Sequence, residues 1–413
     1  MYKIKTFPSK IRGKVKISGS KNASLPIIVA ALLNEGQTRL TNIPNIADIN
    51  NLINVIDNIG PIKKRYKNTL ILEGKFNYCE LLFDELKKFR ASYYFMGLFL
   101  TLFQEVKIYA PGGCQIGKRP INYHLEGFKA AGVAVLEDTN IIHLKADTLH
   151  PFTYHLPKKS LGATVNLLLL ASKIEGVSVI HNASLEPEVE DLIAFLNKLG
   201  IKIFRYLDML IIRGRKKIKH NIKHRIIPDR IEAMTFIALG VFSQKLKVYR
   251  VNLKHLVKPL QVLKQSGLKC KESRNAITVY RSELRPVEVI NGDYPEISTD
   301  QMPLFYPLYI RTSGQSVFTE SIFEKRFKVL EELKKTNANI IIEETSVKIN
   351  GSDNLIGNDF VPQDLRAAAA LLVEAVINGN STVCNLDYLE RGYEDFIDKL
   401  RKIGVEFEIE KRV

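Results

Sequence analysis

The sequence predicts an α/β fold of six repeated units, arranged as two similar domains. Three observations lead to this prediction. Amphipathic helices recur at regular intervals, each ends at a residue typical of a helix C-terminus, and each unit has a second helix that is apolar on all sides. With 413 residues, 46% hydrophobic and 25% charged, the chain has a globular composition and is long enough for two or three domains.

The amphipathic helices run directly into short β-rich stretches, as in FLNKLGIKI and LRKIGVEF. The residue after each helix is Gly or, in one unit, Asn, and both accept the left-handed conformation found just past a helix end. These residues follow one another at spacings of 67 to 72 positions, so that six units account for the whole chain. They are Gly60, Gly132, Gly200, Gly267, Asn337 and Gly404.

The second helix of each unit is expected to be buried, because a helix that is apolar all round has no face for water. A turn and a short strand follow it, so each unit has the order buried helix, strand, loop, amphipathic helix, strands. Three units can bury three such helices together, which gives two domains. The six helices are expected to start near Ala23, Ala91, Ala163, Ile231, Met302 and Ala367.

The chain is basic, with 60 Lys and Arg against 44 Asp and Glu, a formal net charge of +16. Such an excess suits nucleic acid, acidic lipid or anionic small substrates, and a solvated lysine-rich surface explains it equally well. The densest basic run, residues 213–225, has no aromatic residue to stack on bases, which argues against nucleic acid. A basic nucleic-acid-binding repeat protein remains the remote alternative.

Other classes are disfavoured by what the sequence lacks. The longest apolar stretch, Ala91 to Phe103, has 13 residues, fewer than the roughly 20 that span a bilayer, and the N-terminus shows no apolar signal segment. Four cysteines without a CxxC pair fit a reducing cytosol. His220 and His224 have no acidic or Cys residue nearby that would complete a metal site. We therefore expect a cytoplasmic protein without membrane, nucleic-acid or metal partners.

Cations at the expected starts of the buried helices give the first indication of function. Lys21, Arg90, Arg230 and Arg366 stand where the helix macrodipole disfavours positive charge. A bound anion makes a cation and a helix N-terminus compatible, so these positions predict a site for phosphates and carboxylates in a cleft that both domains line. The plain alternatives are that Arg230 is a surface residue paired with the neighbouring Asp, and that Asp229 and Asp364 are N-caps.

A second candidate is Cys114, in the stretch PGGCQIGKRPINYH. Two adjacent glycines argue for a loop position, and Lys118 and Arg119 would stabilise a thiolate. The other cysteines, Cys79, Cys270 and Cys384, are expected to be small hydrophobic residues.

These stretches together resemble one family, the UDP-N-acetylglucosamine enolpyruvyl transferases (1-carboxyvinyltransferases) of the EPSP synthase superfamily. The resemblance covers the chain in order and implies that each domain is an inverse (inside-out) α/β barrel of three units. The first domain would comprise residues 21–228 and the second residues 1–20 with 229–413, with the active site in the interdomain cleft. The motifs are KISGSKNASLPI, PGGCQIGKRP, KSLGATVNLLLLAS, PDRIEAMTF, TESIFEKRF, QDLRAAAALL and ERGYEDFIDKLRKIG.

The resemblance implies transfer of the enolpyruvyl group of phosphoenolpyruvate to the 3′-hydroxyl of UDP-N-acetylglucosamine, the first committed step of peptidoglycan synthesis, without a cofactor or metal. By this likeness Cys114 donates a proton and is the target of fosfomycin, and Asp300 is a plausible general base. Lys21 and Arg391 join them as catalytic residues. Phosphoenolpyruvate would be bound by Lys21, Asn22, Arg119, Arg326, Arg366 and Arg391. UDP-N-acetylglucosamine would be bound by Arg90, Arg119, Pro120, Ile121, Asn122, Tyr123, Lys158, Lys159, Ser160, Leu161, Asp300 and Ile322.

Three stretches depart from the family's usual pattern. Asn122 and Tyr123 stand where the family usually has Asp and Leu, and EKRFKVLEELKKTNAN replaces a common RFMHV…GA sequence. Gln301 and Met302 follow Asp300 where Leu or Met and then Gln are usual. The departures permit a paralogous enolpyruvyl transferase that acts on another uridine nucleotide. The sister activity on shikimate 3-phosphate is the other alternative, although that family does not use a Cys in this loop.

Overall fold

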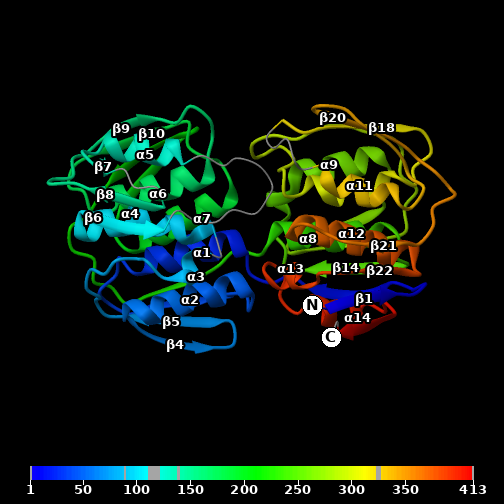
Figure 1. Ribbon diagram of the computed structural model, residues 1–413, viewed down its shortest axis with the longest axis horizontal. Coiled ribbons are helices and arrows are strands. Elements are labelled where there is room, and N and C mark those ends of the chain that lie inside the picture. The colour runs from blue at the N-terminus through cyan, green and yellow to red at the C-terminus, as the bar shows by residue number, and fades with distance from the viewer. Residues whose placement is uncertain (1, 88–89, 110–120, 137–139, 322–326, 412–413) are drawn as a thin grey trace. The chain divides into compact units, whose positions relative to one another are not determined.

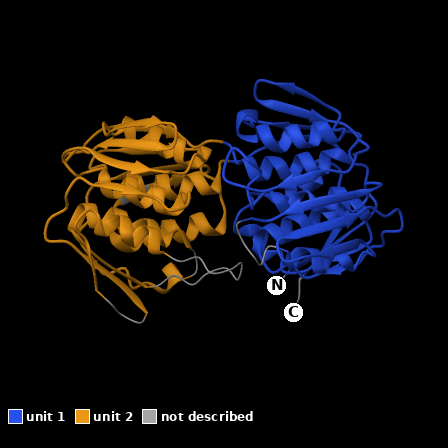
Figure 2. Cartoon of the chain, turned by 90° about the horizontal axis from the view of Figure 1, so that it is seen from above, with its two compact units in different colours: residues 1–18, 114–117, 228–413 blue, residues 19–113, 118–227 orange. Residues whose placement is uncertain are grey.

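Each of the six repeats has a buried helical segment, which is broken in one repeat, and an outer helix and a small sheet (Figure 1). The computed structural model describes residues 2–87, 90–109, 121–136, 140–321 and 327–411. The chain forms two compact units, shown in different colours in Figure 2. Among the described residues, unit 1 comprises 2–18 and 228–411, and unit 2 comprises 19–109 and 121–227. Each unit has a hydrophobic core of its own.

Unit 2 contains three repeats. Its buried helices are α1 (Lys21–Ala31), α4 (Tyr94–Phe103) and α6 (Leu161–Ala171), and α4 contacts both of the others. The amphipathic helices are α2 (Ala47–Ile59), α5 (Asn122–Lys129) and α7 (Pro187–Lys198). Short helices lie at α3 (Asp84–Lys87) and at the 3-10 helix η1 (Arg90–Tyr93), which precedes α4.

The strands of unit 2 form three small sheets. One has the order β13 (Ile222–Arg225), β3 (Thr38–Thr41), β5 (Thr69–Glu73), β4 (Ile62–Tyr66). The second has the order β6 (Glu105–Tyr109), β8 (Ile141–Lys145), β7 (Ala134–Leu136). The third has the order β11 (Lys202–Tyr206), β12 (Met209–Arg213), β10 (Ser178–His181), β9 (Thr153–His155).

Unit 1 repeats this plan. Two of its buried helices are α8 (Arg230–Val241) and α12 (Leu365–Asn378). The third is a broken segment made of the 3-10 helix η3 (Met302–Leu304) and α10 (Tyr306–Tyr309). Helix α12 contacts α8, η3 and α10. The outer helices are the 3-10 helix η2 (Leu253–Leu256), α9 (Val257–Ser266), α11 (Lys328–Lys334), α13 (Asp387–Glu390) and α14 (Phe396–Lys402).

The three sheets of unit 1 have four strands each. One has the order β21 (Asp359–Phe360), β22 (Ser381–Val383), β1 (Tyr2–Thr6), β23 (Phe407–Lys411). The second has the order β15 (Cys270–Ser273), β16 (Ala276–Val279), β14 (Lys245–Tyr249), β2 (Arg12–Lys16). The third has the order β17 (Glu288–Ile290), β18 (Gln315–Thr319), β20 (Ser346–Asn350), β19 (Asn339–Ile342). The N-terminal strands belong here: β1 pairs with β22 and β23, and β2 pairs with β14.

The backbone confirms the repeat. All six residues expected just past the amphipathic helices have positive φ angles, from 67° at Asn337 to 116° at Gly267. Two expected helices differ from the prediction. The segment at Met302 is broken because Pro303 and Pro307 remove backbone donors, and the segment at Ala91 begins as η1 before α4. The six mixed or antiparallel sheets agree with an α/β fold of six units.

Candidate active site

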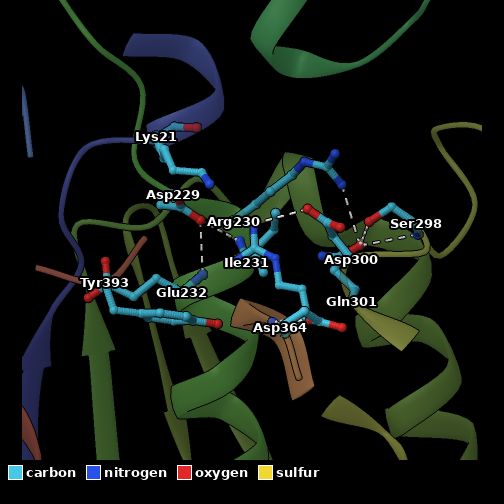
Figure 3. Close-up of polar contacts among 12 residues, drawn as sticks. Lys21, Asp229, Arg230, Ile231, Glu232, Ser298, Asp300, Gln301, Asp364 and Tyr393 are labelled. Carbon is cyan, nitrogen blue, oxygen red and sulfur yellow. Dashed lines mark hydrogen bonds and ion pairs between the residues drawn. The ribbon is translucent and has the colours of Figure 1, made fainter. Parts of the chain in front are cut away.

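An ion pair in unit 1 joins two residues of the candidate site, Arg366 and Asp300, the second of which is labelled in Figure 3. Asp300 lies in the turn just before η3, and Arg366 is the second residue of α12. An Nη2 atom of Arg366 donates to Oδ2 of Asp300 at 3.0 Å, and the two side chains are 6% and 28% exposed. The contact brings together two predicted site residues that are 66 positions apart in the sequence.

The start of α12 fixes the backbone on which Arg366 stands. Asp364 is the N-cap, and its Oδ1 accepts hydrogen bonds from the backbone N–H groups of Arg366 and Ala367 at 2.7 and 3.0 Å. Asp229 caps α8 in the same way, through Ile231 and Glu232 at 2.8 and 2.9 Å. The N-cap interpretation of both aspartates is therefore confirmed.

The guanidinium of Arg366 is buried and remains charged. Burial acts to lower the pKa of Arg366, but the negative charge of Asp300 opposes it and the net effect raises the pKa. The ring of Tyr393 lies 5.9 Å from the guanidinium carbon, and burial raises the pKa of Tyr393 to about 12. Because the phenol stays neutral, Asp300 contributes most to raising the pKa of Arg366, with a smaller contribution from Asp229.

Two other predicted site arginines of unit 1, Arg230 and Arg391, lie at helix ends. Arg230 begins α8 and is only 3% exposed, so its interpretation as a surface arginine is wrong. Its Nη1 atom is 3.4 Å from Oε1 of Gln301, and its guanidinium lies 5.6 Å from the ring centre of Tyr294. Arg391 follows α13 as its C-cap residue and is partly buried.

In unit 2, Lys21 is the first residue of α1, and Ser20 is the N-cap, accepting from the N–H of Ala23 at 3.3 Å. The Nζ atom of Lys21 donates to Oδ2 of Asp48 at 3.1 Å, and both side chains are largely buried. Asn22 follows Lys21 and is partly exposed. The ion pair with Asp48 offsets part of the unfavourable position of a lysine at a helix start.

A second group in unit 2 gathers around His124. Its Nδ1 atom lies 2.8 Å from Nδ2 of Asn166, whose Oδ1 accepts from the N–H of Gly97, so the His nitrogen is the acceptor. Burial, and secondarily the charge of Arg90, lowers the pKa of His124 to about 3. Arg90 itself lies 5.3 Å from the ring centre of Tyr93, and burial lowers its pKa.

The other predicted nucleotide-sugar residues lie at the ends of α5 and α6. Ser160 caps α6 by accepting from Ala163, and Lys158 is exposed beside it. Lys159 bonds Asn182 and pairs with Asp208 at 2.9 Å. Ile121, Tyr123 and Leu161 pack against the core of unit 2. Asn122, at the start of α5, is exposed.

Five predicted site residues fall outside the described part of the chain: Cys114, Arg119, Pro120, Ile322 and Arg326. Two described residues, by contrast, escaped the sequence analysis. Asp48 pairs with Lys21, and Tyr393 lies against Arg366. Neither has a local signal, because each meets its partner only through the tertiary fold.

Within the described ranges, no group of three His, Cys, Asp or Glu side chains is arranged to hold a metal ion. The helices of the described chain are all too short or too polar to cross a membrane.

Each unit has predicted cations at positions that favour anions. Lys21, Arg230 and Arg366 each stand within the first two residues of a buried helix, where backbone N–H groups add to their positive charge. A carboxylate, Asp300, lies against one of these cations and can accept a proton. This combination suits a reaction in which an anionic substrate is bound while a hydroxyl group is deprotonated.

The sequence matches the family described as EPSP synthase (3-phosphoshikimate 1-carboxyvinyltransferase) over residues 5–400. It is 39% identical over 402 residues to the UDP-N-acetylglucosamine 1-carboxyvinyltransferase of Halothermothrix orenii, covering 96% of each chain. It is 35% identical over 409 residues to UDP-N-acetylglucosamine 1-carboxyvinyltransferase 1 of Staphylococcus aureus strain N315, covering 97% of each.

Solved structures share the fold at low sequence identity. The enolpyruvyl transferase NikO from Streptomyces tendae superimposes with a TM-score of 0.91 at 23% identity, covering 100% of this chain and 99% of the other. An EPSP synthase from Acinetobacter baumannii superimposes with a TM-score of 0.77 at 16% identity, covering 100% of each chain.

The family match and these relatives show that the chain is an enolpyruvyl (carboxyvinyl) transferase, an enzyme that moves the enolpyruvyl group of phosphoenolpyruvate to an acceptor. The chain belongs to the EPSP synthase family.

Proposed function

We propose that the acceptor is UDP-N-acetylglucosamine and that the enzyme transfers the enolpyruvyl group to its 3′-hydroxyl with release of phosphate. Relatives of that name are 35–39% identical over 96–97% of this chain. The structural observation that carries the proposal is the partly buried Asp300–Arg366 pair, which places a proton acceptor beside a cation at a helix start. The step would be the first committed one of peptidoglycan synthesis, carried out in the cytoplasm.

The proposed reaction is an addition followed by an elimination. In the addition, Asp300 takes the proton of the acceptor hydroxyl, and the acceptor oxygen bonds to the central carbon of phosphoenolpyruvate. Cys114 gives a proton to the methylene carbon. In the elimination the carbon–oxygen bond to phosphate breaks, the methyl group returns a proton to the Cys114 thiolate, which restores the double bond, and the proton held by Asp300 leaves with the phosphate. We assign the phosphate and carboxylate groups to Lys21, Asn22, Arg119, Arg326, Arg366 and Arg391.

Arginines suit this role because phosphoenolpyruvate carries two anionic groups, each able to accept paired hydrogen bonds from a guanidinium. The nucleotide-sugar is assigned to the residues around the starts of α5 and α6. These are Arg90, Arg119, Pro120, Ile121, Asn122, Tyr123, Lys158, Lys159, Ser160 and Leu161, together with Asp300 and Ile322 from the rest of the chain.

We also propose that each compact unit is an inverse α/β barrel, with boundaries at residues 21–228 for one and 1–20 with 229–413 for the other. The three buried helices at the centre of each unit support this, because in such a barrel the helices lie inside and the sheets outside. Both units carry residues of the proposed reaction, Lys21 in one and Asp300 in the other.

A second candidate is a paralogous enzyme that acts on another uridine nucleotide. Asn122 is exposed at the start of α5 and Tyr123 packs against the core, at the two positions where the sequence departs from the usual Asp and Leu. A different pair of side chains at this helix start changes the hydrogen-bonding groups offered to a base.

The product distinguishes these functions. The purified protein is incubated with phosphoenolpyruvate and UDP-N-acetylglucosamine, and the product is isolated and its structure determined by NMR. We expect an enolpyruvyl ether at the 3′-oxygen of the sugar. Recovery of unchanged UDP-N-acetylglucosamine, with product formed only from shikimate 3-phosphate or UMP, would show that the acceptor is assigned wrongly.

A further inference from the structure

Gln301 follows Asp300 directly and is almost completely buried, with 1% of its surface exposed. A buried side-chain amide must have hydrogen-bond partners for both its oxygen and its nitrogen, or it destabilises the protein.

The oxygen of this amide is fully used (Figure 3). Oε1 of Gln301 accepts from Oγ of Ser298 at 3.1 Å, from the backbone N–H of Ser298 at 3.5 Å and from Nη1 of Arg230 at 3.4 Å. The backbone N–H of Gln301 in turn donates to the carbonyl oxygen of Ser298 at 2.9 Å. This reciprocal Ser-x-x-Gln arrangement resembles a capping box and closes the turn that presents Asp300.

The nitrogen of the amide donates no hydrogen bond to the described residues. Within the described ranges, Nε2 of Gln301 has no hydrogen-bond partner although it is buried. Rotating the amide does not help, because its NH₂ group would then face the donors of Arg230 and Ser298. The orientation is therefore fixed by the contacts of Oε1, and the residue that directly follows Asp300 keeps an N–H donor group to offer. Leaving such a buried donor unpaired destabilises the folded protein.

We propose that Gln301 is a specificity-determining residue, whose Nε2 group donates a hydrogen bond to an uncharged oxygen of the acceptor substrate. The oxygen would belong to a hydroxyl or carbonyl group next to the hydroxyl that Asp300 deprotonates. A neutral donor suits an uncharged oxygen, whereas the phosphate and carboxylate of phosphoenolpyruvate have cations available to them. The inference rests on the proposed function of Asp300.

The test compares Gln301→Met with Ser298→Ala in steady-state assays of phosphate release, using whichever acceptor the wild-type enzyme turns over. Met fills a similar volume without a donor, and the Ser298 variant removes one contact to Oε1 while leaving Nε2 in place. We expect Gln301→Met to raise the KM for the acceptor about five- to tenfold, the value of one buried hydrogen bond, with the KM for phosphoenolpyruvate within about twofold. Ser298→Ala should leave the acceptor KM within about twofold.

A second variant covers the case in which Gln301→Met fails to fold. Gln301→Glu keeps an oxygen for Arg230 and Ser298 and removes the N–H donors, so its acceptor KM should rise as well. An acceptor KM equal to wild type, with only kcat reduced, would overturn the proposal and leave Gln301 as a residue that holds the Asp300 turn. Absence of wild-type turnover with UDP-N-acetylglucosamine would instead count against the proposed function. The role of Gln301 is tested separately, by comparing the variants with wild type on the acceptor that wild type turns over.

Discussion

Arg366 and Asp300 form a partly buried ion pair, with Nη2 of the arginine 3.0 Å from Oδ2 of the aspartate. An arginine in the first turn of α12 is disfavoured by the helix macrodipole. The carboxylate of Asp300 supplies a negative charge that offsets part of this cost. The same contact orients the carboxylate of Asp300. A substrate anion that binds Arg366 would therefore bind next to the group that accepts the proton.

The first prediction concerns this carboxylate. Asp300→Asn keeps the shape of the side chain but cannot take up a proton, so kcat should fall by about 10²–10⁴-fold, the usual contribution of a general base. Asp398→Asn, at an exposed position on α14, serves as the control and should keep wild-type turnover. The measurement is steady-state phosphate release. Turnover of Asp300→Asn within a few-fold of wild type would remove Asp300 as the base.

The second prediction concerns fosfomycin. A cysteine flanked by Lys118 and Arg119 should react as the thiolate, whereas burial raises the pKa of Cys79 and of Cys270 and makes them poorer nucleophiles. Mass spectrometry after fosfomycin treatment should therefore find one adduct, on the peptide that contains Cys114. An adduct on another cysteine peptide would contradict the assignment.

Substitution separates the two roles of the same residue. Cys114→Asp supplies an acid without a sulfur nucleophile and should keep appreciable activity while resisting fosfomycin. Cys114→Ser should lose most activity, because a hydroxyl group is a much weaker acid. Equal activity of the Ser and Asp variants in the phosphate-release assay would show that residue 114 does not donate the proton.

The third prediction concerns pH and stability. Burial, and secondarily Arg90, lowers the pKa of His124 to about 3 from an ordinary value of 6.5. Between these values the unfolded chain binds more protons than the folded chain, so the stability that depends on neutral His124 is present above pH 6.5 and is lost as the pH falls towards 3. Relative to His124→Gln, wild type should lose up to about 1.4 kcal/mol of unfolding free energy per pH unit in this window.

Urea unfolding of wild type and His124→Gln at several pH values between neutral and mildly acidic checks this expectation. A difference between the two proteins that stays constant with pH would mean that His124 does not remain neutral in the folded state.

The fourth prediction concerns the core of unit 1. Glu374, on α12, has no exposed surface, and its two carboxylate oxygens accept from Nη1 and Nη2 of Arg311, the latter at 2.7 Å. Glu374→Ala leaves a guanidinium without its partner and should destabilise the unit by about 3–5 kcal/mol. Asp398→Ala, which breaks an exposed pair with Arg401, should cause a far smaller shift. Similar thermal unfolding midpoints for the two variants would contradict this account.

Much of the fold follows from local sequence patterns. The six left-handed residues from Gly60 to Gly404 were predictable because Gly and Asn after an amphipathic helix have few other roles. The prolines at 303 and 307 show the limit: a run of apolar residues predicts burial, yet backbone donors decide whether the helix is continuous.

The candidate site was predictable as a set of residues and not as a set of contacts. Cations at helix starts are visible in the sequence because they violate a local electrostatic rule. Their partners are not, since Asp48 meets Lys21 across 27 positions and Asp300 meets Arg366 across 66. The unpaired amide nitrogen of Gln301 is likewise a property of packing, which no spacing in the sequence reveals.

The central claim is tested most directly by phosphate release from phosphoenolpyruvate with each acceptor supplied separately to the purified enzyme. We predict rapid release with UDP-N-acetylglucosamine and only background release with shikimate 3-phosphate, with UMP or without an acceptor. Release that is fastest with shikimate 3-phosphate or UMP, or that does not depend on UDP-N-acetylglucosamine, would contradict the proposed function.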